Sequence, residues 1–185
     1  EAPMTSAPRY LLVGLGNPGA RYESTRHNAG FMAMDAIIAR HGLTSQGRKF
    51  HGDFYKGSVA DVPVIALKPH TFMNRSGVSV HEAARFYKLG PEALIVFHDE
   101  LDLATGKLRI KLGGGLGGHN GLKDIHRILG PAFWRVRLGI DHPGDRDQVT
   151  AYVLSTFTAA ERPKLDQQLD LLADALPLLL AGTPE

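Results

Sequence analysis

His27 and Asp99 are the residues of this sequence best suited to acid–base chemistry. A neutral imidazole can accept a proton near pH 7, because its reference pKa is ~6.5. A carboxylate on the other ring nitrogen would fix the tautomer and stabilise the imidazolium that forms. The chain has no cysteine, which excludes a thiolate nucleophile, and no G-x-S-x-G segment supports an activated serine. The group that such a base would activate is therefore water.

Three asparagines supply neutral dipoles for the same chemistry. Asn17, Asn74 and Asn120 could polarise a carbonyl or bind a developing oxyanion without adding charge. Each of them, like Asp99, follows a strand expected from the apolar pattern. Ligands of open α/β sheets bind beyond the carboxyl ends of the strands, so parallel strands would bring these clusters together. The alternative is that each cluster is a separate polar turn.

Apolar runs and helical periodicity alternate along the chain and predict the elements that position these residues. The expected strands cover residues 10–13, 50–55, 62–67, 93–97, 107–112 and 133–140. Helices are expected from Asn28 to Gly42, over 78–89, from the glycine-rich segment to Leu129, and after the capping box Thr158–Glu161. We therefore predict one α/β domain, with a twisted mixed, largely parallel β-sheet of five to seven strands flanked by helices on both faces.

The composition agrees with a globular domain. The chain has 185 residues, of which 43% are hydrophobic and 22% charged, so general disorder is excluded. No stretch approaches ~18 uninterrupted apolar residues, which excludes a membrane-spanning helix. We expect residues 9–181 to form the domain and residues 182–185 to be a tail. Residues 1–8 are expected to be a tag remnant, before a native start at Met4, and a disordered N-terminus.

A basic segment suggests a polyanionic ligand. Residues 103–137 contain seven Lys/Arg and a single acidic residue, whereas the whole chain has a net charge of only +2. Arg109 and Lys111 share one face of their expected strand, as Arg135 and Arg137 do on the next, so four cations could clamp a phosphate. The glycine-rich segment 113–121 would let backbone N–H groups approach a ligand closely.

Two competing interpretations use the same residues. Gly14–Gly19 matches the G-x-G-x-x-G dinucleotide pattern, but Pro18-Gly19 is typical of a turn, and Asp35 lies in a helix and not at a strand end. A zinc site is disfavoured, because no pair has H-E-x-x-H spacing and amides are poor zinc ligands. The candidate ligands for that site are His27, His98, Asp99, His119 and His142.

Five segments together resemble the bacterial peptidyl-tRNA hydrolase family, in the family's order. They are GLGNPGARYESTRHNAGF (14–31), PHTFMNRSG (69–77), HDELDL (98–103), KLGGGLGGHNGLKDI (111–125) and RVRLGIDHPG (135–144). The resemblance implies hydrolysis of the ester that joins a peptide to the 3′ ribose of tRNA, which recycles tRNA from peptidyl-tRNAs that leave the ribosome. It also implies a cytoplasmic monomer that has peptidyl-tRNA as its partner, needs no cofactor or metal and does not associate with a membrane.

The resemblance also implies roles for single residues. By that likeness His27 is the general base, Asp99 supports its basic form, and Asn17 separates N-blocked from free aminoacyl-tRNA. The positions that match contacts near the tRNA 3′ end and the peptide are Tyr22, Phe72, Met73, Asn74 and Asn120. His119 matches a position that lines the same substrate cleft. The positions that match the family's clamp for tRNA phosphates are Arg109, Lys111 and Arg137.

The sequence departs from the family at three places. Leu116 is bulkier than the small or polar residue often found in the glycine-rich segment, Asp141 stands where Gly is common, and the chain lacks a basic C-terminal tail. An alternative of another class remains, because the sequence also resembles plant organellar splicing adaptors that bind RNA and a protein partner. Such an adaptor would not need the polar site residues, all of which are present here.

Overall fold

The apolar run Tyr10–Gly14 forms β1 at the centre of a seven-stranded sheet in the computed structural model, which describes residues 7–182. The strand order is β2-β3-β4-β1-β5-β7-β6. The other strands are β2 (Thr44–Lys49), β3 (Gly52–Val59), β4 (Val62–Pro69), β5 (Leu94–Glu100), β6 (Leu108–Leu112) and β7 (Trp134–Gly139). The expectations for residues 1–6 and 183–185 lie outside the described residues.

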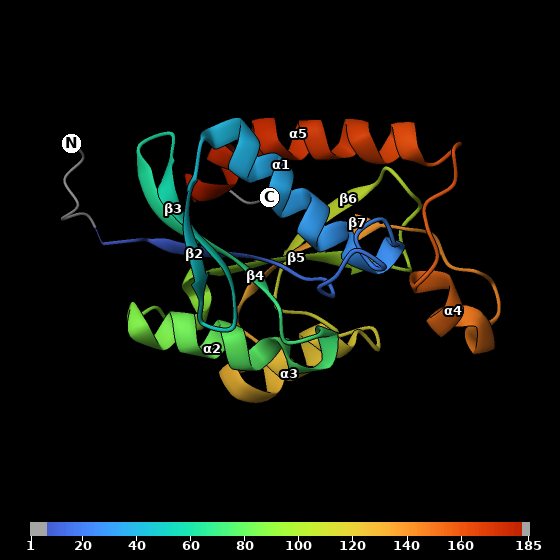
Figure 1. The fold of residues 1–185 in the computed structure, drawn as a ribbon, viewed down its shortest axis with the longest axis horizontal. Helices are drawn as coiled ribbons and strands as arrows, with labels where there is room; N and C mark the ends of the chain where they lie inside the picture. The colour runs from blue at the N-terminus through green and yellow to red at the C-terminus, as the bar shows by residue number, and fades with distance from the viewer. Residues whose placement is uncertain (1–6, 183–185) are drawn as a thin grey trace.

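Helices cover both faces of the sheet (Figure 1). The long helices α1 and α5 lie on one face, and α2 and α3 lie on the other. The helices are α1 (Ala29–His41), α2 (Ser76–Phe86), α3 (Asn120–Leu129), α4 (Val149–Val153) and α5 (Arg162–Leu180), and the 3₁₀ turns are η1 (Arg26–Asn28), η2 (Met73–Arg75), η3 (Pro91–Ala93) and η4 (Arg146–Gln148). The predicted fold class is confirmed.

Strand direction determines where side chains gather. β1 pairs in parallel with β4 and β5, and β5 pairs in parallel with β7, so four carboxyl ends meet at one edge. β6 is antiparallel to β7, so the condition under which residues 107–112 would end at that edge, a parallel strand, is not met. Leu112 pairs with Trp134 at the start of β7, and the glycine-rich segment must carry the chain back to the site.

Alternation along the central strands builds two cores. Ile95 and Phe97 of β5 point to the α1 and α5 face, whereas Leu94 and Val96 point to α2 and α3. All four side chains are buried, as expected of a strand covered by helices on both sides.

Local signals set most element boundaries. Gly42 ends α1 in the left-handed conformation, as predicted. The capping box also forms, since Thr158 N donates to Glu161 Oε1 and Glu161 N donates to Thr158 Oγ1. α2 begins two residues earlier and ends three residues earlier than expected, and α5 continues past Pro177 to Leu180.

Two glycines allow α1 to start directly against the sheet. A Cβ at Gly30 would lie 2.3 Å from the carbonyl oxygen of Phe97, and one at Gly14 would lie 2.3 Å from the carbonyl oxygen of Gly30. Only glycine allows backbones to approach this closely. The start of α1 is thereby held at the ends of β1 and β5, which places His27 of η1 beside Asp99 of β5.

Candidate active site

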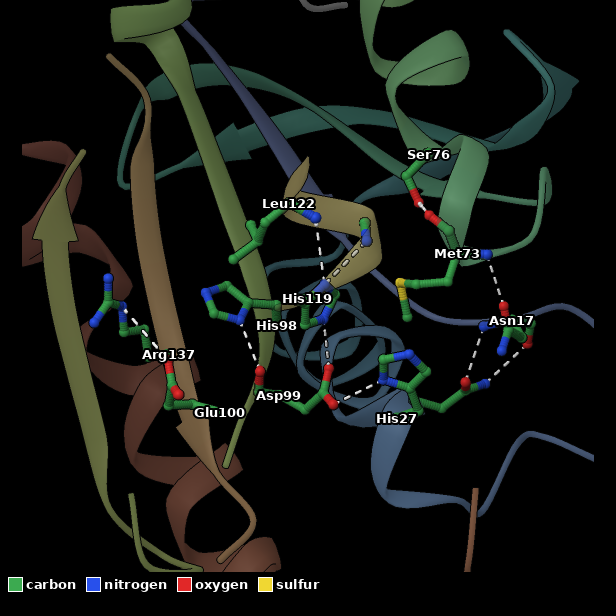
Figure 2. A network of polar contacts seen from close by, with 12 residues as sticks. Asn17, His27, Met73, Ser76, His98, Asp99, Glu100, His119, Leu122 and Arg137 are labelled. Atoms are coloured by element: carbon green, nitrogen blue, oxygen red, sulfur yellow. Dashed lines mark hydrogen bonds and ion pairs between the residues drawn. The ribbon is translucent and has the colours of Figure 1, made fainter. Parts of the chain in front are cut away.

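Asp99 lies between two histidines at the carboxyl edge of the sheet (Figure 2). Its Oδ2 is 2.7 Å from Nδ1 of His27, and its Oδ1 is 2.8 Å from Nε2 of His119. These residues come from η1, β5 and the start of α3, which are far apart in the sequence. The predicted contact between His27 and Asp99 is therefore present, and His119 is a second partner of the same carboxylate.

The hydrogen bonds of His119 fix its tautomer. Its Nδ1 accepts from the backbone N–H groups of Gly121 and Leu122, at 3.1 and 3.3 Å, and so caps α3. Nε2 must then carry the proton that is donated to Asp99. With one oxygen of the carboxylate accepting from His119, the other oxygen accepts Nδ1–H of His27, which leaves Nε2 of His27 as the basic nitrogen.

The environment strengthens His27 as a base. Burial opposes protonation, but the charge of Asp99 and its hydrogen bond outweigh burial and raise the pKa of His27 above 6.5. Burial acts in the opposite direction on Asp99, where the two histidines nevertheless hold the carboxyl pKa well below its usual range. Asp99 therefore stays ionised whenever His27 is titrated.

His98 contacts both Asp99 and His119. Its Nδ1–H donates to the carbonyl oxygen of Asp99 at 2.8 Å, and its ring meets that of His119 edge-on, with the ring centroids 5.2 Å apart. Burial and the neighbouring His119 lower the pKa of His98 to about 3, so it stays neutral. A neutral His98 adds no positive charge that would oppose protonation of His27.

The amide of Asn17 is oriented by the backbone around it. Its Oδ1 accepts from Met73 N at 2.8 Å (Figure 2). A pair of hydrogen bonds also joins the Asn17 backbone to the side chain of Asn28. Because Oδ1 faces the backbone N–H group of Met73, the NH₂ group is the part of the amide that can be offered to a ligand. Asn17 can thus present amide donors to the cleft.

A cleft of about 680 Å³ brings most of the predicted residues together. Its polar lining comes from Asn17, His27, Asn74, His98, Asp99, Glu100, His119, Asn120, His142 and Arg146. Its other lining residues are Phe72, Met73, Leu101, Leu116, Gly117, Gly118, Val149, Thr150, Val153 and Leu154. Leu116 therefore contributes an apolar side chain to the cleft.

Two predicted contact residues stand at the rim. Phe72 has a φ of 66°, which is strained for a residue with a Cβ, and its side chain is 50% exposed. Tyr22 does not line the cleft itself but packs edge-on against Phe72, with the ring centroids 6.3 Å apart. Met73 is buried below them and meets the cleft from inside.

The four cations of β6 and β7 share one face but not one role. Arg109 and Lys111 are exposed, and they pair across the strands with Arg137 and Arg135. Arg137 lies 3.8 Å from Glu100 and donates to the carbonyl of Gly115.

Arg135 is fully buried, and its guanidinium donates to the carbonyl oxygens of Gly114, Gly115 and Pro131. The prediction that Arg135 is available for a phosphate was wrong, because backbone carbonyls occupy its donors. It instead holds the glycine-rich segment on the sheet.

A metal centre fits these residues poorly. Within residues 7–182, the one group of His and acidic side chains close enough to share an ion is His27, Asp99 and His119. The Nε2 of His119 carries a proton, because Nδ1 accepts two backbone hydrogen bonds, so this nitrogen cannot ligate. His142, another ligand candidate, lines the cleft outside this group.

Asp141 has a use that the sequence did not indicate. It adopts a φ of 66°, which explains why glycine suits this position. Its carboxylate accepts from the backbone and the hydroxyl of Thr105, at 3.2 and 3.0 Å. The side chain therefore ties the loop after β5 to the end of β7.

Sequence reasoning also missed one wall of the cleft. η4 and the five-residue α4 follow a polar, proline-containing stretch, and only Val153 of this helix is buried. The pairing of Val149 with Val153 at i and i+4 was the available signal, but it is too short to identify a helix.

Comparison with known proteins identifies the family. The sequence profile described as Peptidyl-tRNA hydrolase matches residues 11–185. The chain belongs to the peptidyl-tRNA hydrolase family. The peptidyl-tRNA hydrolase of Rhodospirillum rubrum is 56% identical over 174 residues, which cover 94% of this chain and 72% of that protein. That of Dinoroseobacter shibae is 57% identical over 172 residues, which cover 93% and 73%.

A solved structure agrees with this assignment. The crystal structure of peptidyl-tRNA hydrolase from Acinetobacter baumannii superposes with a TM-score of 0.91 at 43% identity, covering 96% of this chain and 92% of that chain. The prediction of a hydrolase is confirmed, and nothing in these relatives favours the splicing-adaptor alternative. Within residues 7–182 of this peptidyl-tRNA hydrolase family member, none of the helices is long and apolar enough to cross a bilayer.

Proposed function

We propose that this chain hydrolyses the ester bond between a peptide, or an N-blocked amino acid, and the 3′ ribose of tRNA. The observation that carries the proposal is the tautomer set by Asp99. His27 donates through Nδ1, so its Nε2 is free to take a proton from water. Family membership supplies the substrate class.

The reaction needs one base and no protein nucleophile. His27 Nε2 removes a proton from water as the oxygen attacks the ester carbonyl, and Asp99 stabilises the resulting imidazolium. Asparagine NH₂ groups in the cleft donate to the oxyanion of the tetrahedral intermediate. The imidazolium then returns the proton to the departing 3′ oxygen of the ribose, which gives tRNA and a peptide carboxylic acid that ionises in water.

Asn17 supports selectivity for blocked substrates. Its NH₂ group can donate to the carbonyl oxygen that blocks the α-nitrogen of the residue esterified to tRNA. In a peptide this carbonyl belongs to the preceding residue, and in an N-acetyl-amino acid it belongs to the acetyl group. An unblocked substrate has a free α-ammonium group in place of that carbonyl. The ammonium group has only donors, so it cannot accept a hydrogen bond from the Asn17 NH₂ group. We propose the other cleft asparagines, Asn74 and Asn120, as further substrate contacts, with Tyr22, Phe72, Met73 and His119 around them.

Charge supports tRNA binding beside the cleft. Arg109 and Lys111 are exposed on the sheet face that also carries Arg137. We propose that these three contact tRNA phosphates, so binding should weaken as salt rises. The predicted cytoplasmic location and monomeric state stay predictions.

The test is deacylation of N-acetyl-aminoacyl-tRNA and of the unblocked aminoacyl-tRNA by the wild-type protein and His27→Ala. We expect the wild type to release only the N-acetyl-amino acid. His27→Ala should lose about 10²- to 10⁴-fold in turnover while still binding tRNA. Equal cleavage of both substrates would reject the selectivity, and unchanged turnover by His27→Ala would reject the base.

A further inference from the structure

Arg26, which directly precedes His27, is a buried arginine with its side chain only 5% exposed. One guanidinium nitrogen lies 2.7 Å from Oε1 of Glu161. The other donates to the carbonyl oxygen of Thr156 at 3.1 Å and to the hydroxyl of Ser155. All three partners belong to the connection between α4 and α5.

The backbone makes the same junction. Arg26 N donates to the carbonyl oxygen of Ser155 at 3.0 Å, and Thr25 forms an antiparallel bridge with Thr156. The turn η1, which carries His27, is therefore paired with a segment about 130 residues later in the chain. Arg26 joins these segments through both its main chain and its side chain.

The guanidinium also packs against the wall of the cleft. It lies 4.2 Å from the ring centroid of Tyr152 in α4 and 5.6 Å from that of Phe157. Tyr152 is in turn anchored, since its hydroxyl donates to the carbonyl oxygen of Ile140 at 2.5 Å. Val153, next to Tyr152, lines the cleft, as His27 does. Arg26 is therefore in contact with the α4 wall of the cleft and directly precedes the base His27.

Geometry, more than charge or stability, explains this arrangement. Replacing a buried ion pair by apolar side chains is often neutral or stabilising, so the Arg26–Glu161 pair is weak evidence of a stabilising role. Arg26 is also not among the groups that shift the pKa of His27, whereas Asp99 is. A planar guanidinium with several donors can hold two segments in one fixed relation.

We propose that Arg26 is a positioning residue for His27: it locks η1 to the Ser155–Glu161 connection, so that the imidazole meets both Asp99 and the α4 wall in one geometry. The proposal rests on the proposed function, because His27 is the base there. Arg26 touches neither water nor substrate in this scheme and acts through the place of its neighbour.

Arg26→Met tests the proposal, because methionine keeps much of the apolar packing and removes every donor. We expect kcat for N-acetyl-aminoacyl-tRNA to fall about 10- to 100-fold, while KM changes less, since small displacements of a catalytic group have effects of this size. The titration of the His27 ring, followed by NMR, should move to lower pH as the bond to Asp99 loosens.

Two further variants separate positioning from folding. Arg26→Met/Glu161→Gln leaves no unpaired buried charge, and glutamine keeps the capping box with Thr158. We expect this double variant to recover the melting temperature but not kcat. Arg40→Met is the matched control, because Arg40 also joins two distant segments, α1 and α5, through Asp174 and lies outside the cleft. We expect it to keep wild-type kcat.

Two results would overturn the proposal. One is recovery of kcat together with the melting temperature in the double variant, which would make the role structural. The other is an unchanged His27 titration in Arg26→Met. Because the titration needs no substrate, it still tests Arg26 if the wild type fails to deacylate the blocked tRNA, a result that would reject the proposed function alone.

Discussion

Two aspartates in this molecule have the same connectivity and different surroundings. Asp99 is shared by His27 and His119 at 2.7 and 2.8 Å, and Asp53 of β3 is shared by His70 and Arg48 at 2.9 and 3.1 Å. The side chain of Asp99 is 3% exposed, whereas that of Asp53 is 33% exposed. Burial, and not the number of partners, distinguishes the two sites.

Solvent screening explains why the difference in burial between Asp99 and Asp53 matters. Charges near solvent interact weakly because they are screened, whereas a buried carboxylate acts strongly on its partners. Asp99 therefore raises the pKa of His27 and fixes its tautomer beside a cleft, while Asp53 lines no part of that cleft. The comparison predicts that equal substitutions at the two aspartates have unequal effects.

Asp99→Asn should have the largest effect. His119 must still donate to the remaining oxygen, so the new NH₂ group would face His27 Nδ1 and force the proton onto Nε2. The base would then be blocked, and we expect kcat to fall about 10²- to 10⁴-fold, as for triad carboxylates in serine proteases. Steady-state deacylation measures it, and a loss below about threefold would contradict the account.

His119 has two roles, support of Asp99 and capping of α3, which two substitutions can separate. His119→Ala removes both, so we expect kcat to fall about tenfold and stability to fall by about 1 kcal/mol. His119→Asn should restore the cap, because asparagine is a good N-cap residue, without restoring kcat. Thermal melting and turnover of both variants distinguish the two roles. If kcat recovers together with the melting temperature in His119→Asn, His119 acts only as a cap of α3 and does not support Asp99.

Lys111 tests the contrast between buried and exposed charges at the proposed RNA contacts. Because its charge is exposed, Lys111→Gln should leave kcat unchanged, raise KM several-fold and reduce the slope of log KM against log salt by about one unit. Lys164→Gln, on the exposed side of α5, is the control and should change neither. Identical salt slopes for Lys111→Gln and the wild type would exclude Lys111 from phosphate binding.

Asp53→Asn should have the smallest effect. Its ion pairs are partly exposed, so we expect kcat within about twofold of the wild type and a stability loss of at most about 1 kcal/mol. Urea unfolding and deacylation measure the two quantities. A loss of kcat comparable with that of Asp99→Asn would mean that connectivity, and not burial, controls the chemistry.

The sequence allowed the central strands and most polar residues of the cleft lining to be predicted because both leave local marks. Buried strands such as β5 are continuous apolar runs, and the polar residues of the cleft follow them directly. β2 was missed because every residue in it is exposed, so no apolar alternation marks it. α4 was missed because five residues cannot establish a period.

Partners distant in the sequence could not be predicted from it. Nothing in the alternating pattern Trp134–Leu138 distinguishes the buried Arg135, whose donors meet backbone carbonyls, from Arg137 on the same face. The contact of Arg26 with Glu161 joins residues 135 positions apart and depends on the tertiary fold. The antiparallel direction of β6 likewise follows from pairing with β7 and not from its own sequence.

The most direct test of His27 as a base controlled by Asp99 is the pH dependence of kcat/KM in the wild type, Asp99→Asn and Asp53→Asn. A base acts only when neutral, so the rate must fall as pH drops through the pKa of His27, which Asp99 raises above 6.5. The account predicts that this acidic limb lies above pH 6.5 in the wild type and Asp53→Asn. In Asp99→Asn it should move to lower pH, since only the lowering effect of burial remains. The same acidic limb in all three proteins would contradict it.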